Sequence, residues 1–174
     1  MTNREMNKDC RRRDTCRLCG GDRLILVLEL TPTPPANAFV SADALDAAQK
    51  SFPLDLFFCE DCAHVQLLDV VNPRVLFENY VYVSGTSPAF VQHFEDYAET
   101  LIGRFATGLE TKRVIDIGSN DGTLLSAFAS RGFQVLGIDP ARDIAADATR
   151  RGIETKAAFF TSTLAEEIRA SDGP

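Results

Sequence analysis

The chain has 174 residues, of which 45% are hydrophobic and 25% are charged, and its formal net charge is −7. This composition allows one domain or two small ones, and the acidic balance argues against general binding to nucleic-acid phosphates. No apolar run approaches the roughly 20 residues of a membrane span, and the N-terminal residues lack the apolar segment of a signal peptide. We therefore expect a cytoplasmic protein, with reduced thiols and with no nucleic-acid or membrane partner.

The first part of the chain is expected to be a flexible N-terminal arm, residues 1–14, followed by a β-rich domain, residues 15–70. The basic cluster Arg11–Arg13 lies in the arm, and we interpret it as solvated. Runs of aliphatic and aromatic residues predict three strands in the β-rich domain, at 24–30, 52–58 and 64–70. Ser41 is a candidate N-cap for a short helix between the first two strands.

Residues 71–107 are predicted to be a helical connector. Asn72-Pro73 and Ser87-Pro88 are typical helix starts, because a polar N-cap precedes a proline whose missing N–H has no helical partner at that position. The second helix has apolar residues at helical spacing. These residues are expected to face the core: Phe90, Phe94, Tyr97, Leu101 and Phe105.

Residues 108–174 are predicted to alternate between strands and helices with short connections. Strands are expected at 113–119, 133–140 and 153–160. Helices are expected at 121–132, 141–152 and 161–171. This alternation is typical of parallel strands in an α/β fold.

Two C-x-x-C pairs, Cys16/Cys19 and Cys59/Cys62, are separated by 39 residues. Four thiolates suit tetrahedral Zn²⁺ at a structural site, and the glycines after Cys19 allow a tight turn. Unmetallated thiols and a redox C-x-x-C are the alternatives. His64 is a candidate ligand that we interpret instead as a supporting or packing residue, and Cys10 lies apart in the N-terminal arm.

The stretch "VIDIGSNDGTLL" reads as a strand, a turn bracketed by Gly118 and Gly122, and a helix. Asp139 ends the next strand about twenty residues later, where an acid can accept hydrogen bonds from ribose hydroxyls. Asn120-Asp121 in the turn would disfavour a pyrophosphate. S-adenosylmethionine (SAM) is a cation without phosphate, so this acidic turn favours SAM. A purely structural α/β turn is the alternative.

These motifs together resemble the N-terminal part of the sugar C-methyltransferases of bacterial deoxysugar pathways. Those enzymes depend on SAM and begin with a small zinc-binding domain. The matching stretches are "CRLCG", "CEDCAHVQL", "YVYVSGTS", "VIDIGSNDGTLL" and "GIDPA". The resemblance implies an α/β fold class, with a small zinc-binding β-rich domain before an incomplete Rossmann-like class I methyltransferase domain.

The resemblance also implies roles for individual residues. Structural zinc would be held by Cys16, Cys19, Cys59 and Cys62. The SAM pocket would be lined by Ser84, Asp116, Gly118, Ser119, Asn120, Asp121, Gly122, Asp139 and Pro140. Tyr80 and Tyr82 would face the cleft for the cofactor and a nucleotide-linked sugar, or would pack between the domains.

In the family's reaction a base removes a proton beside a sugar ketone, and the enolate carbon attacks the methyl group of SAM. The family's candidates for that base lie in a later segment, and neither His64 nor His93 is a persuasive substitute. The strand predicted at 113–119 would also lie at an exposed sheet edge. We therefore expect an N-terminal fragment or one half of a split enzyme, completed by a missing C-terminal half or a complementing chain.

Two other functions remain open. The first is a non-catalytic module that uses a zinc domain and a vestigial SAM-binding half to bind a partner protein. The second is a nicotinamide-dependent oxidoreductase, which the absence of a third glycine in the turn disfavours. The motifs do not choose between methylation of carbon and of oxygen.

Overall fold

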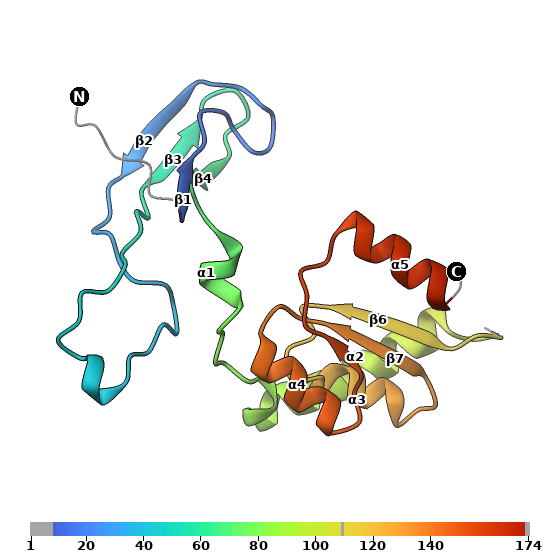
Figure 1. Cartoon of the computed structure of the whole chain (residues 1–174). Helices are drawn as coiled ribbons and strands as arrows, with labels where there is room; N and C mark the ends of the chain where they lie inside the picture. Colours follow the sequence, from blue (N-terminus) through green and yellow to red (C-terminus); the bar gives the residue numbers. More distant parts are fainter. Residues whose placement is uncertain (1–8, 109, 173–174) are drawn as a thin grey trace. The chain divides into compact units, whose positions relative to one another are not determined.

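The computed structural model describes residues 9–108 and 110–172. The chain divides into two compact units, the first ending at Leu76 and the second starting at Phe77 (Figure 1). Among the described residues, no helix has both the length and the apolar character needed to cross a bilayer.

The described residues of the first unit form five short strands in two antiparallel sheets. The strands are β1 (Cys10–Arg12), β2 (Leu24–Leu28), β3 (Leu56–Cys59), β4 (Val65–Leu67) and β5 (Asp69–Val71). The larger sheet has the order β2-β3-β4, and the smaller one pairs β1 with β5. The predicted strand at 24–30 is therefore confirmed as β2, and the one predicted at 52–58 overlaps β3 only from Leu56 onward.

Three features of this unit differ from the prediction. Part of the arm, expected to be flexible, forms β1, because Arg12 forms an ion pair with Asp69 at 2.8 Å and its guanidinium lies over the Phe57 ring. The expected third strand is divided into β4 and β5. The expected helix after Ser41 is only the 3-10 turn η1 (Ala42–Ala44), and the Ser41 side chain makes no capping hydrogen bond.

The two predicted helix starts in the connector are confirmed. Helix α1 (Pro73–Phe77) begins after Asn72, whose Oδ1 accepts a hydrogen bond from the Arg74 N–H at 3.1 Å. Helix α2 (Pro88–Phe105) begins after Ser87, whose Oγ accepts from the Phe90 N–H at 3.4 Å. The 3-10 turn η2 (Ser84–Thr86) lies between them.

The buried face of α2 was predicted only in part, because Leu101 packs against the core as expected but three of the aromatic residues are exposed. Phe90, Tyr97 and Phe105 are exposed, whereas Ala98 is completely buried. Ala98 is small enough to let α2 approach the next helix closely, and it packs in one cluster with Phe128. Helix α2 therefore belongs to the second unit and is not a separate connector.

The second unit has a three-stranded parallel sheet in the order β6-β7-β8. The strands are β6 (Arg113–Ile117), β7 (Gln134–Ile138) and β8 (Thr155–Lys156), and the helices after them are α3 (Thr123–Ala129), α4 (Arg142–Arg150) and α5 (Ser162–Asp172). Figure 1 shows α5 on one face of the sheet and α2, α3 and α4 on the other. The predicted alternation and parallel pairing are thus confirmed.

The two faces of this sheet are covered to different extents. On one face, Val114 and Val135 pack against buried residues of α3 and α4. On the other, Leu136 and Ile138 of β7 pack against Ile168 of α5. In β6, however, Ile115 and Ile117 remain 41% and 58% exposed, and β7 is the one described strand that pairs with β6. The predicted exposed edge is therefore present.

Candidate functional site

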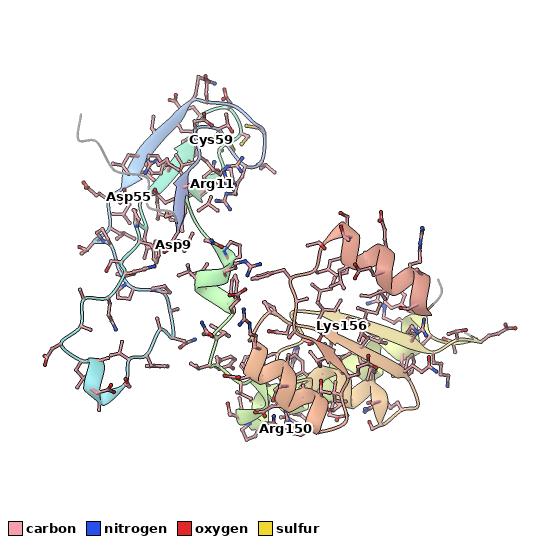
Figure 2. The ribbon with its side chains drawn as sticks, in the orientation of Figure 1. Asp9, Arg11, Asp55, Cys59, Arg150 and Lys156 are labelled. Carbon is pink, nitrogen blue, oxygen red and sulfur yellow. The ribbon has the colours of Figure 1, made fainter. Side chains whose placement is uncertain are left out.

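The four predicted cysteines meet at one point in the first unit, where Figure 2 labels Cys59. The Sγ atoms of Cys16, Cys19, Cys59 and Cys62 all lie within 4.8 Å of one another. Cys16 Sγ lies 3.7 Å from Cys62 Sγ, and Cys19 Sγ lies 3.6 Å from Cys59 Sγ. Tetrahedral Zn²⁺ with Zn–S bonds of about 2.3 Å requires sulfurs about 3.8 Å apart, so the residues present fit this ion.

The two cysteine knuckles share one backbone pattern. In the first, the Gly20 N–H donates to Cys16 O at 3.0 Å, and Gly20 has a φ of 79°. In the second, the Ala63 N–H donates to Cys59 O at 2.8 Å, and Ala63 has a φ of 59°. A left-handed residue after each pair turns the chain so that both sulfurs face the same point. The predicted glycine turn is confirmed, and an alanine adopts the same conformation in the second knuckle.

His64 supports the second knuckle through its backbone. Its carbonyl oxygen accepts from the Cys59 N–H at 2.9 Å, just as Gly21 O accepts from the Cys16 N–H at 2.7 Å. Among the described residues, the cluster of possible metal ligands contains four cysteines and no histidine. This agrees with the prediction that His64 is a supporting residue.

The electrostatics of the cluster suit a cation. Backbone N–H groups, that of Cys19 first, lower the pKa of the Cys16 thiol to about 6. Burial, together with the neighbouring sulfurs, raises the pKa of the Cys62 thiol to about 12. The second thiolate is therefore costly to form beside the first, and a divalent cation removes that cost by pairing with both.

Gln66 is a supporting residue that the sequence analysis did not identify. It is 5% exposed, and its Nε2 lies 3.0 Å from Cys16 Sγ. Its Oε1 accepts from the Arg17 N–H at 2.9 Å. One amide thus donates to a metal-ligand sulfur and holds the backbone beside it. The only sequence signal was a polar residue at an inward-facing position of an otherwise apolar strand.

The second candidate site lies at the carboxyl ends of β6 and β7. Gly118 has a φ of 81°, and its N–H donates to Ile138 O at 2.8 Å, which bends the chain across the end of β7. A Cβ at Gly118 would meet no atom within 4 Å, so the space above this residue is open. Gly122 has a φ of 75°, and a Cβ there would lie 2.8 Å from Ile153. The two predicted glycines therefore have different roles, one facing open space and one in close packing.

Asp139 anchors the glycine turn. Its Oδ2 accepts from the Asn120 N–H and its Oδ1 from the Ala141 N–H, both at 2.8 Å. The carboxylate is buried, but each oxygen has a second acceptor position. The residue is therefore committed to backbone contacts in addition to any contact with a ribose.

Asp116 is the less committed acid of the site. Burial, and then the charge of Asp139, raises the pKa of Asp116 above its ordinary value. A half-buried carboxylate that feels the charge of a second one favours a cation in the cavity that it lines. A cationic ligand such as SAM, which the sequence analysis expected here, would suit this charge.

Two cavities adjoin the glycine turn and share Gly118 and Asn120. The smaller, of about 170 Å³, is lined by residues that include Asp116, Ser119 and Ser84. The larger, of about 400 Å³, is mostly apolar. Its lining includes Tyr80, Asp139, Pro140, Phe159 and Phe160. The structure therefore brings most of the predicted SAM residues together around the end of the sheet.

Asn120 and Asp121 differ from the other predicted SAM residues. Both line the smaller cavity, yet the polar atoms of their side chains are bonded to protein groups.

Tyr82 packs edge-to-face with Tyr80, with ring centroids 6.5 Å apart. His93 is exposed and stacks on Tyr97. Among the described residues that line the two cavities, none is a histidine.

A cavity of about 710 Å³ in the first unit is a weaker candidate for chemistry. Most of its lining is apolar. Three of its polar side chains are engaged with protein groups: Gln66 with Cys16 and Arg17, Asp69 with Arg12, and Arg17 with Leu67 O. Thr33 and His64 also line it. The glycine turn of the second unit is therefore the better candidate ligand site.

Comparisons with known proteins agree with the division of the chain into two units. Residues 16–77 match the family model described as "Putative zinc binding domain". The chain is 34% identical over 160 residues to the C-methyltransferase NovU of Streptomyces niveus. That match covers 92% of this chain, and the chain spans 38% of the length of NovU. The second finding confirms the predicted resemblance of the chain to part of a C-methyltransferase, and the first agrees with a zinc-binding domain in its first unit.

Proposed function

We propose that the second unit binds SAM at the glycine turn, as the cofactor-binding part of a methyltransferase that acts on carbon. The unit would be an incomplete Rossmann-like class I methyltransferase domain. The observation that supports this most is the open space above Gly118 beside the half-buried carboxylate of Asp116. A cationic ligand without phosphate fits that combination, whereas a dinucleotide would bring its pyrophosphate against two acids.

When bound, the cofactor supplies an electrophilic methyl group. Asp116 would stabilise the cationic part of the ligand, and Gly118 would let the ligand approach the main chain closely. Asp139, through its remaining acceptor positions, would orient the ribose. These groups bind and orient. The base that deprotonates the substrate is not assigned to any of them.

The four-cysteine site would hold Zn²⁺ with a structural role. Four thiolates complete a tetrahedral shell, so no position is left for a water or a substrate oxygen. The cytoplasm, where thiols stay reduced, is the compartment that we propose for the protein.

The proposed substrate is a nucleotide-linked keto sugar, methylated on carbon. This part of the proposal draws on the C-methyltransferase activity of the relative and on the position of Tyr80 at the larger cavity. Because the chain spans 38% of that relative, transfer and its substrate concern the whole protein. Cofactor binding is the step that the 174 residues can be tested for directly.

Calorimetric titration of the zinc-loaded chain with SAM, and separately with NAD⁺, tests the proposal. We expect one SAM per chain and no binding of NAD⁺. Gly118→Ala and Gly132→Ala form a matched pair, because both glycines have a φ of 81° and a Cβ at either would meet no atom within 4 Å. Each substitution should cost roughly 1–2 kcal/mol of backbone strain, but only Gly118→Ala should weaken SAM binding. Tight NAD⁺ binding, or equal SAM binding by both variants, would refute the proposal.

A non-catalytic, partner-binding role is the second candidate. Among the described strands, β6 has a partner on one side only, and its Ile115 and Ile117 are exposed. These features favour the partner-binding role, since an open strand edge can pair with another chain. A methyl-transfer assay on the whole protein separates the candidates. Transfer to a keto sugar nucleotide supports the enzyme, and SAM binding without transfer to any acceptor supports the module.

A further inference from the structure

Asn120 lies where the glycine turn meets the segment Tyr82–Gly85, and both polar atoms of its side chain are bonded to that segment. Its Nδ2 donates to Tyr82 O, and its Oδ1 accepts from the Ser84 N–H, both at 2.9 Å. The Tyr82 carbonyl and the Ser84 N–H lie on either side of Val83, and in a sheet both would bond to the same neighbouring strand. Here the Asn120 side-chain amide bonds to both in place of that strand. Asparagine suits the position because it offers both a donor and an acceptor, and because it tolerates the left-handed φ of 49°.

Asp121 adds a third bond to the same segment. Its Oδ2 accepts from the Gly85 N–H at 3.1 Å, and the residue is 3% exposed. A Cβ at Gly85 would lie 2.5 Å from this oxygen, so glycine is needed for the close approach. The other carboxylate oxygen accepts from the Thr123 hydroxyl at 2.7 Å, which fixes the direction of the side chain.

The segment is also linked to the candidate cofactor site. The Asn120 N–H donates to Asp139 Oδ2 at 2.8 Å, while the Asn120 side chain holds the segment. One residue thus connects the acid at the end of β7 to the chain that follows Tyr80 and includes Tyr82. Ser84, in the same segment, lines the smaller cavity.

We propose that Asn120 and Asp121 are positioning residues, which hold Tyr82–Gly85 against the glycine turn and thereby fix one wall of the cofactor site. Their side chains act on this segment, and only their backbone and neighbours would contact the ligand. The part of this inference that concerns the cofactor rests on the proposed SAM site. The three hydrogen bonds to the segment do not depend on it.

Amide hydrogen exchange on the whole 174-residue chain tests the inference, with two variants of Asn120. Asn120→Asp keeps the shape but places a carboxylate oxygen against Tyr82 O. Asn120→Gly keeps the positive φ and removes both bonds. In each, exchange at Ser84 and Gly85 should become about tenfold faster, while the amides of α3 keep their protection. The near-ultraviolet signal of the Tyr80–Tyr82 pair should weaken. Asn37→Asp is the matched control, since Asn37 also has a positive φ (60°) and belongs to the other unit.

SAM titration of the same samples completes the test. We expect Kd to rise about tenfold in both Asn120 variants and to stay unchanged in Asn37→Asp. Unchanged exchange at Ser84 in both Asn120 variants would overturn the inference, and so would faster exchange with an unchanged Kd. If Asn120→Asp fails to fold, Asn120→Gly decides. A wild-type chain that binds no SAM would instead refute the proposed function, and with it the cofactor part of this inference.

Discussion

The two units of the chain are stabilised by different means. In the first unit, the described buried apolar residues are Cys16, Phe52, Phe57, Cys59 and Leu68, so two of the five belong to the metal cluster. Four successive residues of β2, from Ile25 to Leu28, are each about half exposed. In the described part of the second unit, three clusters of buried side chains connect the sheet to the helices on its two faces.

This difference teaches what each unit needs in order to fold. A unit of this size with few buried side chains gains too little from apolar burial to offset the entropy of ordering its chain, and a metal supplies the deficit. The second unit has a packed core and can use its loops for a ligand site. Residues with positive φ accordingly occur at the cysteine knuckles in the first unit and at the glycine turn in the second.

The largest expected effect is the loss of the metal. Chelation, or Cys16→Ser, should unfold the first unit, because structural zinc contributes on the order of 10 kcal/mol to small metal domains. Cys10→Ser is the control, since Cys10 is outside the cluster. Metal analysis and hydrogen exchange of β2–β4 and of α2–α3 provide the measurement. Equal loss of protection in both units would contradict the comparison.

Removing core volume from the second unit should destabilise that unit and leave the first unit folded. Leu125 is completely buried and packs against Ala148 and Ile153. Leu125→Ala should therefore cost about 2–5 kcal/mol of unfolding free energy in this unit. Zinc content should remain that of the wild type. Urea unfolding followed together with metal release measures both, and simultaneous loss of zinc would show that the units do not unfold separately.

A substitution at Gln66 tests whether the metal site of the first unit also depends on a residue that contacts a cysteine ligand. Gln66→Glu keeps the size of the side chain but replaces the N–H donor at Cys16 Sγ with an anionic oxygen. We expect zinc affinity to fall about 10- to 100-fold, as is typical when a partner of a metal ligand is removed. Competition with a chromophoric chelator measures the affinity. Cobalt substitution reports the thiolate–metal absorption, which should shift in the variant if the amide contacts the ligand sulfur.

The substitution Asp116→Asn should have the smallest effect on folding, and that effect should depend on pH. Because its pKa is raised in the folded state, the folded protein holds this proton more tightly than the unfolded chain. The wild type should therefore lose stability as the pH rises from the unfolded pKa through the folded pKa, and Asp116→Asn should lose less. A cationic ligand favours the ionised form, so SAM should bind more tightly as the pH rises through the same interval. Asp116→Asn should weaken binding about tenfold at neutral pH.

The sequence predicted the fold best where periodicity and end signals agreed. The strand–helix alternation after residue 108 and the starts of α1 and α2 were predicted, because these elements depend on local patterns and caps. The buried face of α2 was predicted only in part. Leu101 packs against the core as predicted, but the most buried position belongs to the small Ala98, and the packing of α3 against α2 selects it. The pairing of β1 with β5 was missed because it depends on Arg12 meeting residues far along the chain.

The candidate sites show the same limit. The spacing of the cysteines predicted the cluster, because two C-x-x-C knuckles leave few other arrangements. Gln66, Asn120 and Asp121 act through single hydrogen bonds to distant groups, which have no signature in residue spacing. The prediction that Asn120 and Asp121 line the cofactor pocket therefore lacked the contacts that the structure assigns to their side chains.

Mapping SAM binding by amide resonances tests most directly the claim that the ligand site and the metal site are separate. The zinc-loaded chain, labelled with ¹⁵N, would be titrated with SAM. We predict saturable shifts at the amides of Gly118, Asn120 and Ala141, with the amides around Cys16 and Cys59 unchanged. Shifts at the cysteine knuckles without shifts at the glycine turn would contradict the claim.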